Sequence, residues 1–418
     1  MPRCHPSLPA NESANAKRHG QNLVVKQRQS RRNRASLLFV LIAAAIVIVL
    51  GSGMAFRGAE ALRVLNEFSL GDAGSLAEGR AREISRQPVT YTVAGRPRQG
   101  DLYRPIEDAK SGLVLVPGAA RAGKDDPRLV AFANTLARAR FVVLVPEIEN
   151  LRHLKVSAED TDDIADAVQY LAQRIGSERA CPVGLVAISY AAGPAILAAL
   201  RPGIGDRVRF VFAIGGYYDM TATVTFFTTG YFRESKGEPW RYQVPNAYGK
   251  WVFALSNAER LSSPRDRVAV AEMAQRKLRD PGANVDDLVR SFGSEARAVH
   301  ALLVNRDPDA VPALIAALPE QIRAETAALD LKHRSLKQLS ARLILIHGRD
   351  DAIIPYSESQ ALAAATAPGR AALHLVDGLA HVDLGPGDLF DVLTLWRAIY
   401  RVLAERDSAA AACKIKTI

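Results

Sequence analysis

Short apolar runs, some of which end at proline or glycine, alternate with segments of helical periodicity over most of this 418-residue chain. The clearest apolar runs are Leu113–Val116, Phe141–Val145, Val183–Ile188, Val208–Ile214, Leu343–Ile346 and Ala372–Val376. Between them, apolar residues recur at helical spacing. Strands interleaved with helices predict an α/β fold with a mostly parallel central sheet, helices on both faces, and ligands at the carboxyl ends of the strands.

The alternation is interrupted once, over about 120 residues that contain helical patterns and no convincing strand. We expect this block to be a helical cap inserted between two sheet strands. The expected organisation is a basic tail (1–34), an apolar span (35–56), a connector (57–88), the first part of the core (89–219), the cap (220–339), the second part of the core (340–405) and a C-terminal tail (406–418).

The formal net charge of +10 comes mostly from the N-terminal tail. Residues 1–34 hold eight basic residues and one acid, which leaves a net charge of only +3 on the remaining 384 residues. A nearly neutral body argues against nucleic acid as a partner, because such binding depends on a basic surface.

The span 35–56 has no charged residue in 22 positions. A helix of that length measures about 33 Å, enough to cross a hydrocarbon core of about 30 Å. Four arginines precede the span between positions 28 and 34, which predicts a single-pass anchor with its N-terminus in the cytoplasm and the body outside. The alternative is a signal peptide cleaved near Ala55, where Gly53-Met54-Ala55 offers small residues, so that the protein is secreted.

The three cysteines, Cys4, Cys181 and Cys413, lie far apart and show no metal-ligand spacing. From this pattern we expect neither a metal site nor a disulfide framework. No other motif indicates an organic cofactor.

Ser189 stands between the predicted strand Val183–Ile188 and a predicted helix. A nucleophile on such a tight strand-to-helix turn needs small residues two positions before and after it. Ala187 and Ala191 meet that requirement, although glycine is more common there. The alternative is a serine that only caps the following helix.

Two further residues follow later strands of the predicted sheet. Asp351 lies in His347-Gly-Arg-Asp-Asp-Ala-Ile-Ile-Pro355, and His381 follows the next strand. In this order of Ser, Asp and His, and in the pattern His-Gly-x-x-Asp-x-x-x-Pro, the sequence resembles the α/β hydrolases from about residue 89 to residue 403. Asp350 is expected to be solvated, and Asp383 is a spare candidate for the acid.

The resemblance implies a serine hydrolase with a catalytic triad. Ser189 would attack the substrate, His381 would accept its proton, and Asp351 would orient the imidazole. The backbone N–H groups of Tyr190 and Ala119 would form the oxyanion hole. Many relatives have His-Gly where this chain has Pro117-Gly118, and Gly118 could serve the turn alone.

Eleven of the 27 aromatic residues fall between Tyr217 and Phe253, in the predicted cap. Most are expected in the core of the cap, and the density of aromatic residues favours an apolar ester or acyl substrate. The other histidines, among them His347 in the turn and His374 within a strand, are expected to be structural. The expected function is therefore that of a membrane-anchored carboxylic-ester hydrolase without metal or cofactor.

Other functions stay open at this point. The same triad can cleave amides or thioesters or transfer acyl groups, and a non-catalytic member of the fold could serve as a binding or scaffold protein. Haloalkane dehalogenases and epoxide hydrolases are disfavoured because they carry Asp where Ser189 stands. The sequence does not predict an oligomeric state.

Overall fold

The structure, a computed structural model, describes residues 51, 53–68, 84–105, 108–177, 180–235, 237–380, 383–384 and 389–415. The chain divides into two units, Met1–Ala59 and Glu60–Ile418. The predicted membrane span, 35–56, lies almost wholly outside the described residues. Within them, no helix is both long and apolar enough to cross a bilayer.

Eight strands form one sheet in the order β1-β2-β4-β3-β5-β6-β9-β10. They are β1 (Ile84–Val93), β2 (Arg96–Pro105), β3 (Ser111–Val116), β4 (Phe141–Pro146), β5 (Val183–Ile188), β6 (Val208–Ile214), β9 (Arg342–Gly348) and β10 (Ala371–Val376). β1, β2 and β4 pair antiparallel, and all pairs from β4 to β10 are parallel. The prediction of an α/β fold with a mostly parallel sheet is confirmed.

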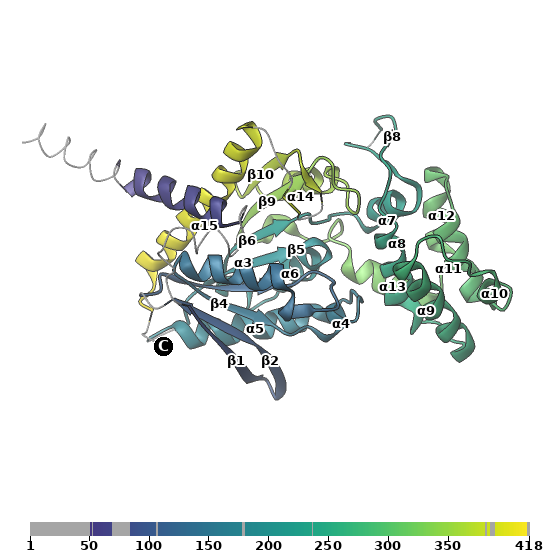
Figure 1. Ribbon diagram of the computed structural model, residues 1–418, viewed down its shortest axis with the longest axis horizontal. Coiled ribbons are helices and arrows are strands. Elements are labelled where there is room, and N and C mark those ends of the chain that lie inside the picture. Colours follow the sequence, from purple (N-terminus) through teal and green to yellow (C-terminus); the bar gives the residue numbers. More distant parts are fainter. Residues whose placement is uncertain are drawn as a thin grey trace, which may run out of the picture. The chain divides into compact units, whose positions relative to one another are not determined.

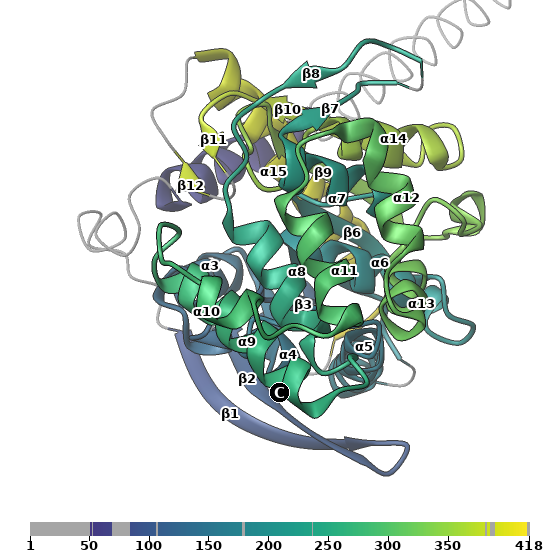
Figure 2. The same cartoon turned by 90° about the vertical axis from the view of Figure 1, so that its right-hand side faces the viewer.

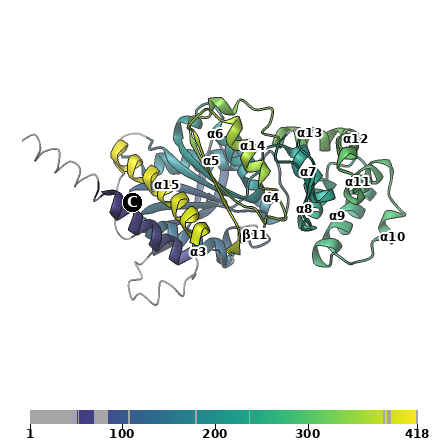
Figure 3. The ribbon, with the colours of Figure 1, turned by 90° about the horizontal axis from the view of Figure 1, so that it is seen from above.

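Helices cover both faces of the sheet (Figures 1 and 3). One face carries α5 (Asp160–Ile175), α6 (Ala192–Ala199) and α14 (Ser357–Ala365), and the other carries α3 (Pro127–Arg138) and α15 (Leu389–Ala412). Alternate residues of a buried strand therefore enter different cores, as Val114 and Leu115 of β3 do. This is why the inner strands are apolar throughout.

The cap lies beyond the carboxyl ends of the strands and consists mainly of helices (Figure 2). Its helices are α7 (Met220–Thr229), α8 (Tyr248–Ala258), α9 (Pro264–Arg279), α10 (Asp286–Val289), α11 (Ser294–Val304), α12 (Val311–Ala316) and α13 (Glu320–Leu329). It also contains a two-stranded ribbon, β7 (Tyr231–Phe232) with β8 (Arg241–Tyr242). These strands of two residues each are too short to produce an alternating pattern in the sequence.

Local signals set the beginnings of the longer helices. Asp126 caps α3 by accepting from the backbone N–H of Arg128, and Pro127 begins the helix. Asp219 caps α7 in the same way, and α7 ends at Gly230 in the left-handed conformation. Asp219 thus marks the point where the chain leaves the sheet and enters the cap.

The last helix extends well past the expected end of the core at residue 405. Arg406 is fully buried, and its guanidinium bonds to Glu60 (Nη2–Oε2, 2.7 Å) and to the carbonyl of Ala139 (2.6 Å). A buried guanidinium needs such partners. This site joins α15 to the helical residues 60–68, whose side chains Ala61, Val64 and Leu65 enter the core beside α3.

Cys181 and Cys413 form a disulfide, with their Cα atoms 5.7 Å apart and 232 positions apart in the sequence. The sequence pattern, from which no disulfide framework was expected, did not predict this bond. Sequence spacing alone could not reveal the bond, because it depends on the path of α15 back to the residues before β5. An isolated bridge between Gly176 and Ile415 joins the same two segments.

Candidate active site

Ser189 occupies a strained backbone position at the carboxyl end of β5. Its φ is +59°, in the left-handed region that residues other than glycine rarely adopt. Ala187 and Ala191 are buried beside it, where larger side chains would not fit the turn. Ser189 is the N-cap of neither the short η2 helix (Ser189–Ala191) nor α6. The structure therefore does not support a capping role, and strain of this kind is typical of a functional residue.

The predicted oxyanion donors lie next to this turn. Tyr190 is the second residue of η2, in the first turn of a helix, where backbone N–H groups lack intrahelical partners. Ala119 lies in the loop after β3, and in the described part of the chain its N–H donates to no group. Both residues share a cavity with Ser189.

Gly118 precedes Ala119 in the same loop. A Cβ added at Gly118 would meet only ordinary contacts, with Ile188 at 3.5 Å, so this turn does not require glycine.

The acid loop follows β9, two strands away from β5 in the sheet. Asp351 is 1% exposed, and its Oδ1 accepts the backbone N–H groups of Ile353 (2.8 Å) and Ile354 (3.1 Å). Asp350, its neighbour, is exposed. The loop thus fixes the Asp351 carboxylate through the backbone, as a residue that orients a catalytic base requires.

His347 helps to shape this loop, beyond the turn position expected for it. The ring is fully buried: Nε2 donates to the carbonyl of Ile354 (2.9 Å), and Nδ1 accepts from the hydroxyl of Ser359 (2.7 Å). Nε2 also lies 3.3 Å from Oδ2 of Asp351. His347 is therefore a positioning residue for the Asp351 carboxylate.

The structure does not place the predicted base. His381 lies outside the described residues, and the side chain of Asp383 is likewise not described. Just before His381 lies β11 (Leu379–Ala380), which pairs with β12 (Asp383–Leu384). A Cβ at Gly348 would meet the Leu379 carbonyl at 2.2 Å, so glycine there lets this segment approach the acid loop closely.

A cavity of about 1020 Å³ opens at Ser189. Ala119 and Tyr190 line it, as do Tyr248 and Trp251 from the cap. A large apolar part of its lining comes from the core, from Leu65, Phe68, Leu129, Phe132, Leu395 and Ile399. We call this part the apolar arm. The aromatic residues of the cap were taken to favour an apolar substrate, and of the eleven only Tyr248 and Trp251 line this cavity.

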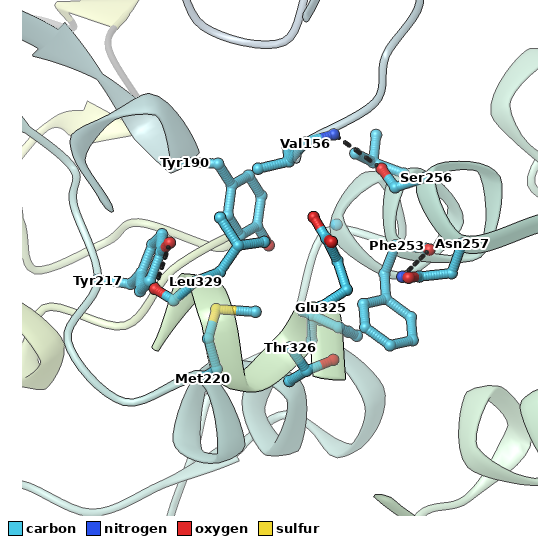
Figure 4. A pocket seen from close by; sticks show the side chains of 13 residues that line it. Val156, Tyr190, Tyr217, Met220, Phe253, Ser256, Asn257, Glu325, Thr326 and Leu329 are labelled. Carbon is cyan, nitrogen blue, oxygen red and sulfur yellow. Dashed lines mark hydrogen bonds between the residues drawn. The ribbon is translucent and has the colours of Figure 1, made fainter. Parts of the chain in front are cut away.

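A second cavity of about 30 Å³ lies behind Tyr190, between the core and the cap (Figure 4). The rings of Tyr190 and Tyr217 and the carboxylate of Glu325 border it. The hydroxyl of Tyr190 is buried without a hydrogen-bond partner in the described structure. Burial raises the pKa of Tyr190, so this side chain stays neutral.

Two polar contacts join the cap to the end of the sheet at which Ser189 and Asp351 lie. The hydroxyl of Tyr248 donates to the carbonyl of Ala119 (2.6 Å), next to the proposed oxyanion donor. Glu358 on α14 is buried and accepts the backbone N–H groups of Tyr218 (2.9 Å) and Asp219 (2.7 Å) where the cap begins. Burial raises the pKa of Glu358 to about 7.

No family model matches the sequence, and no curated protein matches it. Solved structures with a similar course of the chain include the α/β hydrolase GrgF from Penicillium sp. sh18, at 14% identity and a TM-score of 0.46, over 77% of this chain and 99% of that one. The esterase domain of a Rhodothermus marinus protein covers 77% of this chain and 97% of its own, at 12% identity and a TM-score of 0.38. A Pyrobaculum calidifontis esterase covers 86% and 93%, at 14% identity and a TM-score of 0.39.

The decisive observations are in the chain itself, namely the strand order of the sheet and the strained serine after β5. Both features are those of the α/β-hydrolase fold. In this chain Ser189 lies on the turn after β5, and Asp351 lies in the loop after β9. His374, by contrast, is a packing residue of β10, and burial lowers its pKa to about 4.

Proposed function

We propose that this chain is a serine hydrolase that cleaves carboxylic esters through an acyl-enzyme on Ser189. The observation that carries the proposal is the backbone strain at Ser189. Ser189 and Ala119 line the same large cavity. Strain at one residue persists only where surrounding structure enforces it, and such positions cluster at active sites.

The proposed reaction uses the chain's own groups. Oγ of Ser189 attacks the ester carbonyl while His381 accepts the hydroxyl proton, and the N–H groups of Tyr190 and Ala119 stabilise the oxyanion. The alcohol leaves with the proton from His381. Water then attacks the acyl-enzyme, with His381 again as the base, and the carboxylic acid is released. Asp351 holds the imidazole in the required tautomer.

Covalent labelling tests this proposal. The purified full-length chain is treated with a fluorophosphonate probe, alongside Ser189→Ala and the control Ser408→Ala, which removes an exposed hydroxyl on α15. We expect labelling of the wild type and of the control, and none of Ser189→Ala. A folded wild type that does not react would leave a non-catalytic binding protein as the better account.

We further propose that the chain is anchored by residues 35–56, with the hydrolase outside the cytoplasm. The disulfide between Cys181 and Cys413 supports this orientation, because such bonds persist in oxidising compartments. Cells are treated with a thiol-alkylating reagent before and after reduction. We expect both cysteines to react only after reduction in a full-length, membrane-bound chain. Alkylation without reduction would contradict the orientation, and a mature chain that begins near Phe56 would indicate a cleaved signal peptide.

A further inference from the structure

The large cavity has charged residues as well as an apolar arm. They are Glu67, Arg121, Asp126, Arg128, Lys277 and Arg279. Both acids already have basic partners, since Glu67 pairs with Arg138 (3.3 Å) and Asp126 with Arg128 (3.2 Å). The acids therefore do not neutralise the other cations at this site.

Three cations of the cavity have weak partners or none. Arg121 forms no ion pair within the described residues, and Lys277 donates only to the carbonyl of Pro281 (3.0 Å). Arg279 reaches the carboxylate of Glu272 at 3.9 Å, which Arg276 already holds at 2.7 Å. We call Arg121, Lys277 and Arg279 the basic rim.

A buried lysine strengthens the positive potential behind this rim. Lys250 on α8 is 8% exposed and has no carboxylate partner in the part of the chain that the structure describes. Its Nζ lies 5.7 Å from the centre of the Trp251 ring, and Nζ of Lys277 lies 5.9 Å from the same centre. Burial, together with Arg306 and Lys277, lowers the pKa of Lys250 to about 8. Cations crowded in this way favour an anion nearby.

The rim is close to the reacting groups. Arg121 follows Ala119 by two positions in the loop after β3, and its charge acts on the hydroxyl of Tyr248, which is bonded to the Ala119 carbonyl. Lys277 is beside Trp251, which lines the same cavity as Ser189. Ser189 and the three cations of the rim thus line one cavity, which a single substrate can occupy.

We propose that the substrate is an amphiphilic ester, with its apolar chain in the apolar arm and an acidic group held by Arg121 and Lys277. This inference rests on the proposed hydrolase function and adds the substrate class to it. The acidic group is a carboxylate, sulfonate or phosphate, because each presents oxygens that accept from guanidinium and ammonium groups. A soluble acid ester and an anionic lipid share this chemistry.

The test compares two hexanoyl esters that differ in charge, 4-hexanoyloxybenzenesulfonate and 4-hexanoyloxybenzenesulfonamide. The full-length enzyme is assayed in one non-ionic detergent, and the readout is the ratio of kcat/KM for the sulfonate to that for the sulfonamide. We expect the double variant Arg121→Gln/Lys277→Gln to lower this ratio about tenfold relative to the wild type. The control Arg265→Gln, an exposed cation elsewhere on α9, should leave the ratio of kcat/KM unchanged.

In the wild type the ratio of kcat/KM should also fall as the salt concentration rises from 50 to 500 mM, because salt screens the attraction between the acidic group and the cations.

A second arm uses 1-oleoyl lysophosphatidate and 1-oleoylglycerol, which differ by one phosphate. A preference for the phosphate ester that the double variant loses indicates a lipid source, and a preference confined to the sulfonate indicates a soluble one. Equal ratios in the wild type and the double variant in both arms would overturn the inference. If Ser189→Ala retained turnover of the uncharged ester, the proposed function itself would fail, which is a distinguishable result.

Discussion

The sheet edge and the cap contribute to one cavity by different means. At the sheet edge, Ser189 and Asp351 are fixed by the backbone, through a left-handed turn in one case and two amide hydrogen bonds in the other. In the cap, Tyr248 and Lys277 reach the same cavity with long side chains from helices. Under the proposed function, the backbone-fixed groups at the sheet edge would carry the chemistry, and the side chains of the cap would adjust the fit and charge of the substrate.

The largest effect is expected from the acid at the sheet edge. Asp351→Asn retains an oxygen for the amides of Ile353 and Ile354, but it stabilises the wrong tautomer of His381. We expect kcat to fall by about 10⁴-fold, measured with a p-nitrophenyl ester. The comparison variant is Asp383→Asn, which should have a small effect. A silent Asp351→Asn beside an inactive Asp383→Asn would show that the acid was assigned wrongly.

The junction between sheet and cap should depend on pH. The folded state raises the pKa of Glu358 from its ordinary value of 4.5 to about 7, so the folded chain holds a proton that the unfolded chain releases. Stability linked to this group is therefore present below pH 4.5 and is lost as the pH rises toward 7. We expect the melting temperature to fall between pH 5 and pH 8, and to fall less in Glu358→Gln.

Glu320→Gln, at an exposed glutamate of the cap, is the control for this pH dependence. Burial also raises the pKa of Asp160 to about 7, so part of the decline should persist in both variants. An identical decline in the wild type and Glu358→Gln would contradict the role of Glu358 at the junction.

A smaller effect is expected where the cap contacts the oxyanion loop. Tyr248→Phe removes the hydrogen bond to the carbonyl of Ala119, a bond worth about 1 kcal/mol. We expect kcat/KM to fall about fivefold and the melting temperature to fall by no more than about 4 °C. The control Tyr242→Phe alters an exposed tyrosine of β8. If both variants were equally active, the cap would not help to position Ala119.

The smallest effect is expected at the hydroxyl of Tyr190. It has no partner in the described structure, so Tyr190→Phe should change kcat/KM by less than about twofold and should not lower stability. Steady-state kinetics and thermal unfolding measure both. A tenfold loss of activity would show instead that the small cavity behind Tyr190 holds a group that takes part in the reaction.

The sheet could be predicted from the sequence because short apolar runs that alternate with helical periodicity form a strong local pattern. The strands Val183–Ile188 and Val208–Ile214 were predicted with the observed bounds. Ser189 was predicted from its small neighbours together with the later Asp351 and His381, in the order that the α/β hydrolases use. The acid loop with Asp351 was predicted from the resemblance of the segment from His347 to Pro355 to the acid loop of the α/β hydrolases.

The remaining features depend on contacts that sequence spacing does not encode. The disulfide joins residues 232 positions apart, and the apolar arm combines residues near position 65 with residues of α15. The basic rim was missed for another reason. A net charge of +3 over residues 35–418 suggested a neutral body, but net charge does not reveal which cations lack partners.

The most direct test of the central claim is the pre-steady-state hydrolysis of p-nitrophenyl hexanoate. An acyl-enzyme on Ser189 predicts a rapid burst of about one p-nitrophenol per chain, followed by slower turnover, and no burst in Ser189→Ala. Turnover by Ser189→Ala at the wild-type rate, with the same burst, would contradict the account.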